Sequence, residues 1–393
     1  MSAPHPILLF IPNLQQGGAE RQMLELMTRL PDRFAPTLCV YQDATHYRDY
    51  LPPGEPAHDL RVRRMGPVGL RRLVQVVREV RPTILHSYRD KANLWARLAA
   101  MIEPVPVVLT SCRNRAMHPI HLAAEPLLSR WSDRVLTNSE GVKRELIKLA
   151  RVAPDKIQII HNFIDVAKFR PPSDLERARA RASLGLGPRD IALVLPGRIS
   201  LQKHQLGLAR SLYYLRRRGV LGDHVKVLLA GRERDRWVVR ALPRLLAMFE
   251  VERYTHRLGA VDDMVSLYHA SDALLMPSLY EGLPNAVLEA CASGLPAVVS
   301  HAANIDGIVL HGESGFESAT FDQRGFADGI ERLLALSPEE RRRMGARGRE
   351  HVAATFSADR VLRETVELYD MLIAEKGLSA PRAEAGRRHG AAG

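Results

Sequence analysis

The chain has 393 residues, of which 46% are hydrophobic and 25% are charged, and its formal net charge is +12. This length allows two domains of ordinary size, each able to bury a core. Cys39, Cys112 and Cys291 lie too far apart for a zinc motif or a disulfide framework, which makes a reducing cytosol the expected compartment. The basic charge fits anionic partners such as phosphorylated substrates or an anionic membrane, and equally a solvated surface in an arginine-rich proteome. The absence of an aromatic-interleaved basic motif argues against nucleic acid.

The first half of the chain alternates short apolar runs with helical patterns. Residues 7–11 predict the first strand of a parallel sheet, and the run is too short for a signal peptide or a membrane span. Gly17 and Gly18 then form a glycine turn that opens a helix, and two glycines let backbone N–H groups approach a ligand closely. An ordinary tight turn explains this pair equally well. Further elements are predicted as strands at 37–41, 83–88, 105–110, 133–138 and 156–160, and helices at 91–101 and 139–149.

A basic amphipathic helix is predicted around residues 70–81. Its apolar stripe carries Leu70, Leu73, Val74 and Val77, and its other face carries Arg71, Arg72, Arg78 and Arg81. Such a helix suits contact with an anionic membrane, although it is also typical of the surface of a soluble domain. The proline-rich loop before it, at residues 42–65, has no clear pattern.

The second half repeats the alternation of strands and helices. Strands are predicted at 191–195, 225–230, 255–258, 273–276 and 296–300, with a helix at 261–270 between two of them. Helical patterns then cover 321–356, with a break near Ser337 and Pro338, and 358–373, before a tail rich in Ala, Gly and Arg. Alternation of this kind in both halves indicates an α/β protein with two Rossmann-like domains.

The stretch at residues 277–290 combines a turn, a helix start and two carboxylates. Glu281 lies in the loop after the strand at 273–276, and Glu289 falls on the second turn of a helix whose first turn suits Pro284. Helix N-terminal N–H groups can hold a phosphate, and carboxylates accept hydrogen bonds from hydroxyls. A ligand with both features is a nucleotide sugar, although spacing alone fits two solvated helix charges.

Two cations occupy the loop after another predicted strand. Arg198 and Lys203 follow the strand at 191–195 and precede a helix. A guanidinium can grip two phosphate oxygens, and an ammonium adds a point charge. Taken alone, the spacing of this pair is more typical of two surface cations.

The 22 residues from Pro277 to Val298 resemble the signature block of family-4 glycosyltransferases of the GT-B fold. The resemblance implies two Rossmann-like domains whose parallel sheets face each other across a cleft, with a last helix crossing back to the first domain. It places an acceptor-side domain at 1–168, a nucleotide-sugar domain at 176–356 and the crossing helix at 357–376. The tail at 377–393 is expected to be disordered.

The resemblance also assigns roles to individual residues. Glu281 would hold hydroxyls of the donor sugar, Glu289 would accept from the ribose hydroxyls, and Arg198 and Lys203 would bind the diphosphate. The remaining donor-binding residues that it implies are Gly282, Leu283, Pro284 and Asn285 at the helix start, Gly17 and Gly18 in the first loop, and Leu258 beside the nucleobase.

On the acceptor side the sequence departs from the family pattern. Many members carry a histidine near the end of the strand at 105–110, where this chain has Cys112 and Arg113. We therefore expect Arg113 to line the acceptor site, with His118 as the next candidate. His86 is a third candidate, although a lone histidine of this kind is more often a packing residue.

These features predict a hexosyltransferase that moves a sugar, with retention of configuration, from a UDP- or GDP-linked donor to an acceptor hydroxyl. A lipid-linked or polysaccharide acceptor in bacterial cell-surface glycan synthesis is expected by analogy, with a cytoplasmic location and possible contact with the inner face of the membrane. No Asp-x-Asp pair occurs, which favours transfer without a metal or another cofactor. The alternatives are a nucleotide-sugar 2-epimerase of the same fold and a non-catalytic nucleotide-sugar-binding protein.

Overall fold

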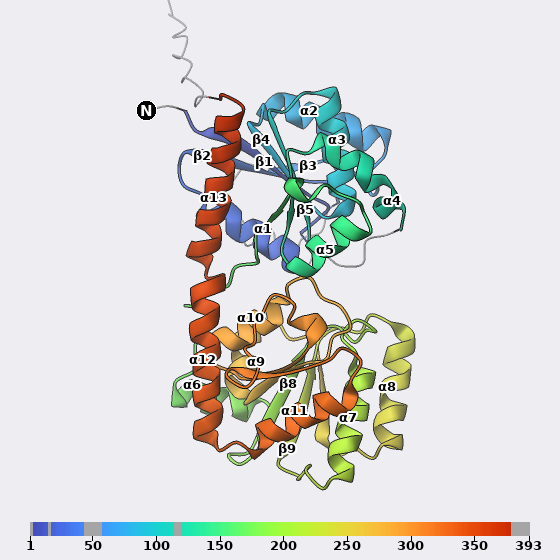
Figure 1. The fold of residues 1–393 in the computed structure, drawn as a ribbon, viewed down its shortest axis with the longest axis vertical. Coiled ribbons are helices and arrows are strands. Elements are labelled where there is room, and N and C mark those ends of the chain that lie inside the picture. The colour runs from blue at the N-terminus through green and yellow to red at the C-terminus, as the bar shows by residue number, and fades with distance from the viewer. Residues whose placement is uncertain (1–2, 15–16, 43–56, 114–118, 379–393) are drawn as a thin grey trace, which may run out of the picture. The chain divides into compact units, whose positions relative to one another are not determined.

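The computed structural model describes residues 3–14, 17–42, 57–113 and 119–378 (Figure 1). The chain divides into two compact units, each a parallel sheet with helices on both faces. The first comprises Met1–Asn138, Val142–Ile160 and Leu362–Gly393, and the second comprises Ser139–Gly141 and His161–Val361. The second unit thus begins at His161, a few residues before the end at 168 that was expected for the first domain.

The first unit is built on a seven-stranded sheet with the order β3-β2-β1-β4-β5-β6-β7, in which every pair of neighbours is parallel. Its strands are β1 (His5–Ile11), β2 (Phe34–Val40), β3 (Ala57–Asp59), β4 (Ile84–Tyr88), β5 (Val107–Cys112), β6 (Arg134–Thr137) and β7 (Ile157–Ile159). Its helices are α1 (Gly18–Arg29), α2 (Pro67–Val80), α3 (Asp90–Ile102), α4 (Pro119–Leu128) and α5 (Glu140–Lys148), whose first two residues count with the second unit.

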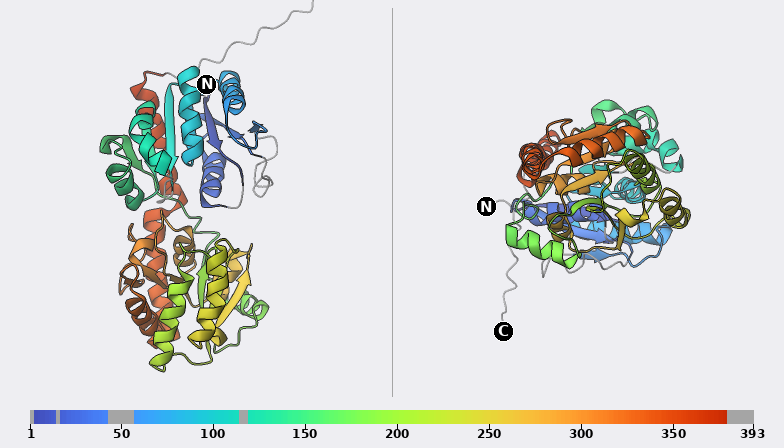
Figure 2. Two further views of the ribbon diagram at one scale, coloured as in Figure 1. Left: turned by 90° about the vertical axis from the view of Figure 1, so that its right-hand side faces the viewer. Right: turned by 90° about the horizontal axis from the view of Figure 1, so that it is seen from below.

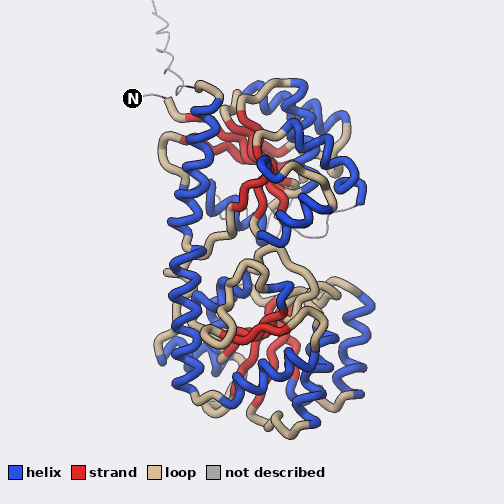
Figure 3. Tube along the Cα trace, viewed as in Figure 1, coloured by secondary structure: helices blue, strands red, loops and turns tan. Residues whose placement is uncertain are grey.

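The central strands of this sheet are buried on both faces, as their continuous apolar sequence predicts. Side chains 7–11 of β1 are fully buried, and Leu8 and Phe10 pack with Leu73 of α2 and Ala96 of α3. The tube drawing shows the strands of each unit enclosed by helices (Figure 3). The predicted strands of the first half are therefore confirmed, with ends displaced by a few residues.

The second unit has a six-stranded parallel sheet with the order β10-β9-β8-β11-β12-β13. Figure 2 shows the strands and helices from two further sides. Its strands are β8 (Ile191–Pro196), β9 (Val225–Ala230), β10 (Thr255–Gly259), β11 (Ala273–Met276), β12 (Ala297–Ser300) and β13 (Gly315–Ser318). Its helices are α6 (Asp174–Ser183), α7 (Gln205–Arg217), α8 (Arg236–Met248), α9 (Met264–Ala270), α10 (Asn285–Ala292), α11 (Gln323–Ala335) and α12 (Pro338–Phe356).

Alternation along the strands divides the core of the second unit into two layers. Ala192 and Val194 of β8 face a cluster that includes residues of α9, α10 and α12. Leu193 and Leu195 face the opposite cluster, which includes residues of α7, α8 and α11. Successive side chains of a strand point to opposite faces, so one apolar strand contributes to both layers.

The end of the chain returns to the first unit through α13 (Ala358–Glu375). The break predicted near Ser337 and Pro338 is confirmed, because α11 ends at Ala335 and α12 starts after Ser337, whose side chain forms a capping box with Glu340. Within the first unit, Tyr369 of α13 hydrogen-bonds His86 at 2.7 Å, and Asp370 pairs with Arg33 at 2.8 Å. The expected crossing of the last helix to the first domain is thus confirmed. Among the described residues, no helix is long and apolar enough to span a membrane.

Candidate functional site

Two loops of the second unit meet at the carboxyl edge of its sheet. β8 and β11 are hydrogen-bonded neighbours, so the loop after β8 (residues 197–204) and the loop after β11 (residues 277–284) emerge side by side. The backbone N–H of Leu279 donates to the carbonyl of Gln202 at 2.8 Å, which joins them directly. Ligands of open parallel sheets bind at this edge, outside the carboxyl ends of the strands.

The two loops bring together an ammonium and a carboxylate from the predicted set. Lys203 Nζ lies 2.7 Å from Glu281 Oε1. The Lys203 side chain is 14% exposed to solvent and the Glu281 side chain is 9% exposed. Gln202 Nε2 donates to the second oxygen of Glu281 at 3.2 Å and to the carbonyl of Tyr280 at 3.1 Å. Both oxygens of Glu281 are therefore held by the neighbouring loop, and its carboxylate is fixed at the strand ends.

Two glycines allow the backbone after β8 to lie close to the Lys203 side chain and to the backbone after β9. Gly197 has φ +144°, and a Cβ on it would lie 2.8 Å from Cε of Lys203. A Cβ on Gly231, which follows β9, would lie only 2.1 Å from the carbonyl oxygen of Gly197. The backbones after β8 and β9 thus pack against each other, and the Lys203 stem crosses Gly197. Arg198, the second predicted cation, is exposed in the same loop.

The turn from Gly282 to Asn285 is held in place by a residue that sequence reasoning missed. Asn162 Nδ2 donates to the carbonyl of Leu283 at 3.1 Å and to Oδ1 of Asn285 at 2.7 Å. Pro284, which was expected in the first turn of this helix, is its N-cap, and α10 begins at Asn285. Asn162 lies in the segment that enters the second unit, more than 120 residues earlier, and no local pattern could reveal it.

Glu289 lies on the second turn of α10, as predicted, and is 95% buried. Its Oε2 accepts a hydrogen bond from the hydroxyl of Tyr268 on α9 at 2.9 Å. A buried carboxylate is costly without partners, so Tyr268 both stabilises Glu289 and fixes its direction. Tyr268 was also missed by sequence reasoning, because α9 and α10 are brought together by packing.

Leu258, predicted to lie beside a nucleobase, is half-buried near the end of β10 and packs against the core. The N–H of Gly231 donates to the carbonyl of Gly259 at 2.6 Å, which joins the loop after β9 to the end of β10. The carboxyl edge of this sheet therefore presents Leu258 and the charged residues of the two central loops.

Among the acceptor-side candidates, His86 is enclosed within the first unit. Its Nδ1 lies 2.7 Å from the Tyr369 hydroxyl and its Nε2 lies 2.8 Å from Ser111 Oγ. Burial, assisted by the nearby Arg113 charge, holds the pKa of His86 well below its ordinary value. These contacts are typical of a packing histidine. The Arg113 guanidinium lies over the ring of Tyr88, with its Cζ 5.1 Å from the ring centroid, and His118 lies outside the described residues.

The glycine turn of the first unit also contains a close contact. Gly17 is the N-cap of α1, Gly18 is its first residue, and a Cβ on Gly17 would lie 2.2 Å from Oε2 of Glu20. Glu20 is buried and pairs with Arg89 at 2.8 Å. The Glu20 carboxylate therefore occupies the space that a side chain at position 17 would need.

Two matches to family models cover most of the chain. Residues 16–168 match the model described as Glycosyltransferase Family 4, and residues 190–336 match the model described as Glycosyl transferases group 1. The second match contains both loops and α10, and the first contains the glycine turn. The chain belongs to the family-4 glycosyltransferases. The resemblance seen in residues 277–298 is thus confirmed.

Curated glycosyltransferases are similar to this one over about two thirds of its length. The UDP-Gal:alpha-D-GlcNAc-diphosphoundecaprenol alpha-1,3-galactosyltransferase of Escherichia coli is 25% identical over 66% of this chain and 68% of that protein. The D-inositol 3-phosphate glycosyltransferase of Saccharomonospora viridis is 32% identical over 61% of this chain. The match spans only 55% of the length of that second protein.

Solved structures confirm the GT-B fold of this glycosyltransferase. The Anabaena protein HepE in complex with UDP and glucose superposes with a TM-score of 0.82, at 18% identity, over 93% of this chain and all of that one. A glycosyltransferase from Rickettsia africae gives a TM-score of 0.81 at 17% identity, over 94% of this chain and 99% of that one. At these identities the likeness establishes the fold.

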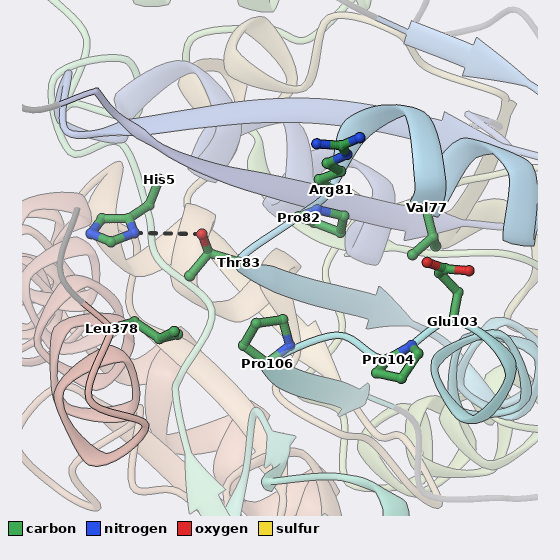
Figure 4. A pocket seen from close by; sticks show the side chains of 9 residues that line it. All are labelled: His5, Val77, Arg81, Pro82, Thr83, Glu103, Pro104, Pro106 and Leu378. Atoms are coloured by element: carbon green, nitrogen blue, oxygen red, sulfur yellow. Dashed lines mark hydrogen bonds between the residues drawn. The ribbon is translucent and has the colours of Figure 1, made fainter. Parts of the chain in front are cut away.

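The first unit also contains cavities that lie away from the carboxyl end of β1, where the glycine turn follows. One of about 280 Å³ is lined by His5, Thr83, Glu103 and Leu378, among others (Figure 4). His5 starts β1 and Thr83 precedes β4, so this cavity lies at the amino edge of the glycosyltransferase's first sheet. Ligands of parallel sheets bind at the opposite edge, and we therefore do not assign the donor to it.

Proposed function

We propose that this glycosyltransferase moves a hexose, with retention of anomeric configuration, from a nucleoside-diphosphate sugar to an acceptor hydroxyl. The observation that carries the proposal is the pairing of Lys203 with Glu281 at the carboxyl edge of the second sheet, beside the buried Glu289. One cation for phosphate and two carboxylates for hydroxyls match the two chemical parts of such a donor.

The proposed roles follow from the position of each group. Lys203 and Arg198 bind the diphosphate and neutralise the charge that develops on it as the sugar leaves. Glu289 accepts from the ribose hydroxyls, since the Tyr268 hydroxyl holds its carboxylate in a fixed direction at the start of α10. Glu281 orients the sugar hydroxyls, and orientation of this kind can contribute several orders of magnitude in rate.

The names of related proteins support a choice of donor and acceptor. The E. coli relative is named for a UDP-linked donor and a diphosphoundecaprenol-linked acceptor, and the Anabaena structure contains UDP. These names favour a UDP-linked donor, with a GDP-linked donor as the second choice, and a lipid-linked or polysaccharide acceptor in cell-surface glycan synthesis. A cytoplasmic protein in peripheral contact with an anionic membrane would suit such an acceptor and the net charge of +12.

The proposal is tested by removing one group from each loop. Glu281→Ala and Arg198→Ala should each lower turnover of the preferred donor severely, by on the order of 100-fold or more, because positioning or charge stabilisation is lost. Release of the nucleoside diphosphate measures turnover, and circular dichroism checks the fold. Turnover like that of the parent in either well-folded variant would contradict the assignment.

We also propose that the transfer needs no metal ion. Arg198, Lys203 and the first turn of α10 supply positive potential that a divalent cation provides in other enzymes. Turnover should therefore persist in excess chelator. Loss of turnover in chelator, restored by magnesium or manganese, would overturn this part of the proposal.

A further inference from the structure

We infer that the outer face of α8 docks this protein on an anionic lipid bilayer. The helix carries Arg236, Arg240 and Arg244 at intervals of four residues, all exposed. Trp237 and Met248 are exposed beside them, by 54% and 65%. At about 3.6 residues per turn these five side chains fall within an arc of roughly 120°.

The opposite face of α8 is buried, and this keeps the five exposed side chains directed toward solvent. Val238, Leu242 and Leu246 are buried in the core cluster between the sheet and its helices. α8 lies beside α7 at the outer edge of the second unit (Figure 1). The helix cannot turn its arginines inward without exposing that apolar stripe.

The arc is free of acidic residues. α8 contains no aspartate or glutamate. Within the described part of the chain, no carboxylate is paired with Arg236, Arg240 or Arg244. The three guanidinium groups therefore present their full charge to an external anion.

The basic helix that the sequence singled out, α2, differs in this respect. Arg72 donates to the backbone carbonyls of Leu60 and Arg61, and Arg78 pairs with Glu103 at 2.6 Å. Glu79 adds a negative charge to the exposed side of the same helix. Much of the basic face of α2 is thus used within the protein, and α8 is the better candidate for a membrane contact.

The start of α8 is tied to the loop that carries Arg198 and Lys203. Asp235, the N-cap of α8, accepts a hydrogen bond from the N–H of Leu201 at 2.8 Å. Leu201 is itself 43% exposed. A bilayer that contacts the start of α8 would therefore lie at the same sheet edge as the candidate site. The inference does not depend on the proposed transfer reaction, because vesicle binding needs no donor.

A bilayer fits this arc better than nucleic acid does. Arginines bind lipid phosphates, while tryptophan partitions into the headgroup region with its apolar body toward the acyl chains. Met248 lies on the same side as Trp237 and adds apolar area at the other end of the helix. A duplex polyanion would engage the arginines and leave Met248 in water.

Sedimentation with vesicles tests the inference. The full chain should bind vesicles of phosphatidylcholine with phosphatidylglycerol and not pure phosphatidylcholine vesicles. The triple variant Arg236→Gln, Arg240→Gln, Arg244→Gln should partition on the order of 100-fold more weakly, since each basic residue near an anionic surface contributes roughly fivefold. The matched control removes three charges from α2 and its C-cap instead, through Arg71→Gln, Arg78→Gln and Arg81→Gln, and should change binding far less.

Fluorescence then separates a bilayer from other polyanions. Tryptophan emission should shift to the blue on anionic vesicles, and the shift should be lost in Trp237→Phe. Equal loss of binding in the α8 and α2 variants would overturn the inference, as would vesicle binding without the Trp237 shift. Binding of duplex DNA that depends on α8, without vesicle binding, would make α8 a nucleic-acid surface and would also overturn it.

Discussion

The position of Glu289 could be predicted from the sequence, but the residue that holds its carboxylate could not. Its place on the second turn of a helix was predictable from residues 282–289, but its partner Tyr268 lies 21 positions earlier on another helix. Gln202 and Asn162 are similar cases, because each supports a predicted residue from a different segment. The charged residues of the site could be found from local sequence, and the residues that hold them could not, since tertiary packing creates those contacts.

Removal of one hydroxyl tests the support of Glu289. Tyr268→Phe should weaken binding of the preferred nucleoside diphosphate roughly tenfold, because a hydrogen bond to a charged group is worth about 1.5–3 kcal/mol. Titration calorimetry measures the affinity. The matched control is Tyr254→Phe, which loses a buried hydrogen bond to the carbonyl of Leu221 in the same unit and should leave the affinity unchanged. Equal effects of the two variants would reduce Tyr268 to a general stability role.

The Lys203–Glu281 pair makes opposite predictions for its two members. Lys203→Met should weaken binding of the nucleoside diphosphate by about 10- to 100-fold, because a charged contact to phosphate is lost. Glu281→Gln should maintain or strengthen binding of the sugar-free diphosphate, since the ammonium no longer has a competing carboxylate 2.7 Å away. The same variant should lose turnover. Weaker diphosphate binding in Glu281→Gln would show that the ion pair itself builds the phosphate site.

Most elements were predictable because their apolar runs and helical stripes are clear, while three of the missed ones carry a weak or contrary local signal. α4 and α8 contain internal prolines, Pro126 and Pro243, which normally argue against a helix interior. β3 is a strand of three residues with exposed ends inside a proline-rich stretch. In each case tertiary packing against the sheet overrides a weak or contrary local signal.

Substitution of Gly231 tests the close contact between the loops after β8 and β9. Gly231→Ala should destabilise the second unit by about 2–3 kcal/mol and weaken donor binding, because its Cβ would lie 2.1 Å from the carbonyl oxygen of Gly197. Gly185→Ala is the control, since it has φ +65° but no atom within 4 Å of the new Cβ, and it should cost about 1 kcal/mol. Thermal unfolding and nucleotide titration measure the two effects. A harmless Gly231→Ala would mean that the loops can separate freely.

At the scale of the whole molecule, the return of α13 to the first unit depends on contacts made by Tyr369 and its neighbours. The sequence resemblance implied that the last helix crosses back, and the amphipathic stripe predicted its extent. The contacts that hold it, such as Tyr369 with His86 and Lys376 with Asp133 at 2.6 Å, join segments hundreds of residues apart. No pattern within either segment could identify these pairs.

The buried His86 makes this attachment depend on pH. Its folded pKa lies well below the ordinary value of 6.5, so below pH 6.5 the unfolded chain takes up a proton that the folded chain does not. Stability should therefore fall as the pH drops, with a contribution from His86 of about 1 kcal/mol between pH 7 and 5.5. His86→Gln should flatten the fall by that amount, whereas Tyr369→Phe should lower stability while the histidine remains. An unchanged slope in His86→Gln would contradict the assignment.

The central claim is that the carboxyl edge of the second sheet binds a nucleoside-diphosphate sugar without a metal ion. Saturation-transfer NMR of the purified protein in chelator, with UDP-, GDP- and ADP-sugars in turn, tests it most directly. We predict selective binding of one nucleotide sugar, with the strongest transfer to its ribose and sugar protons, and loss of that binding in a Lys203→Met, Glu289→Gln double variant. No binding of any donor, or binding that the double variant retains, would contradict the account.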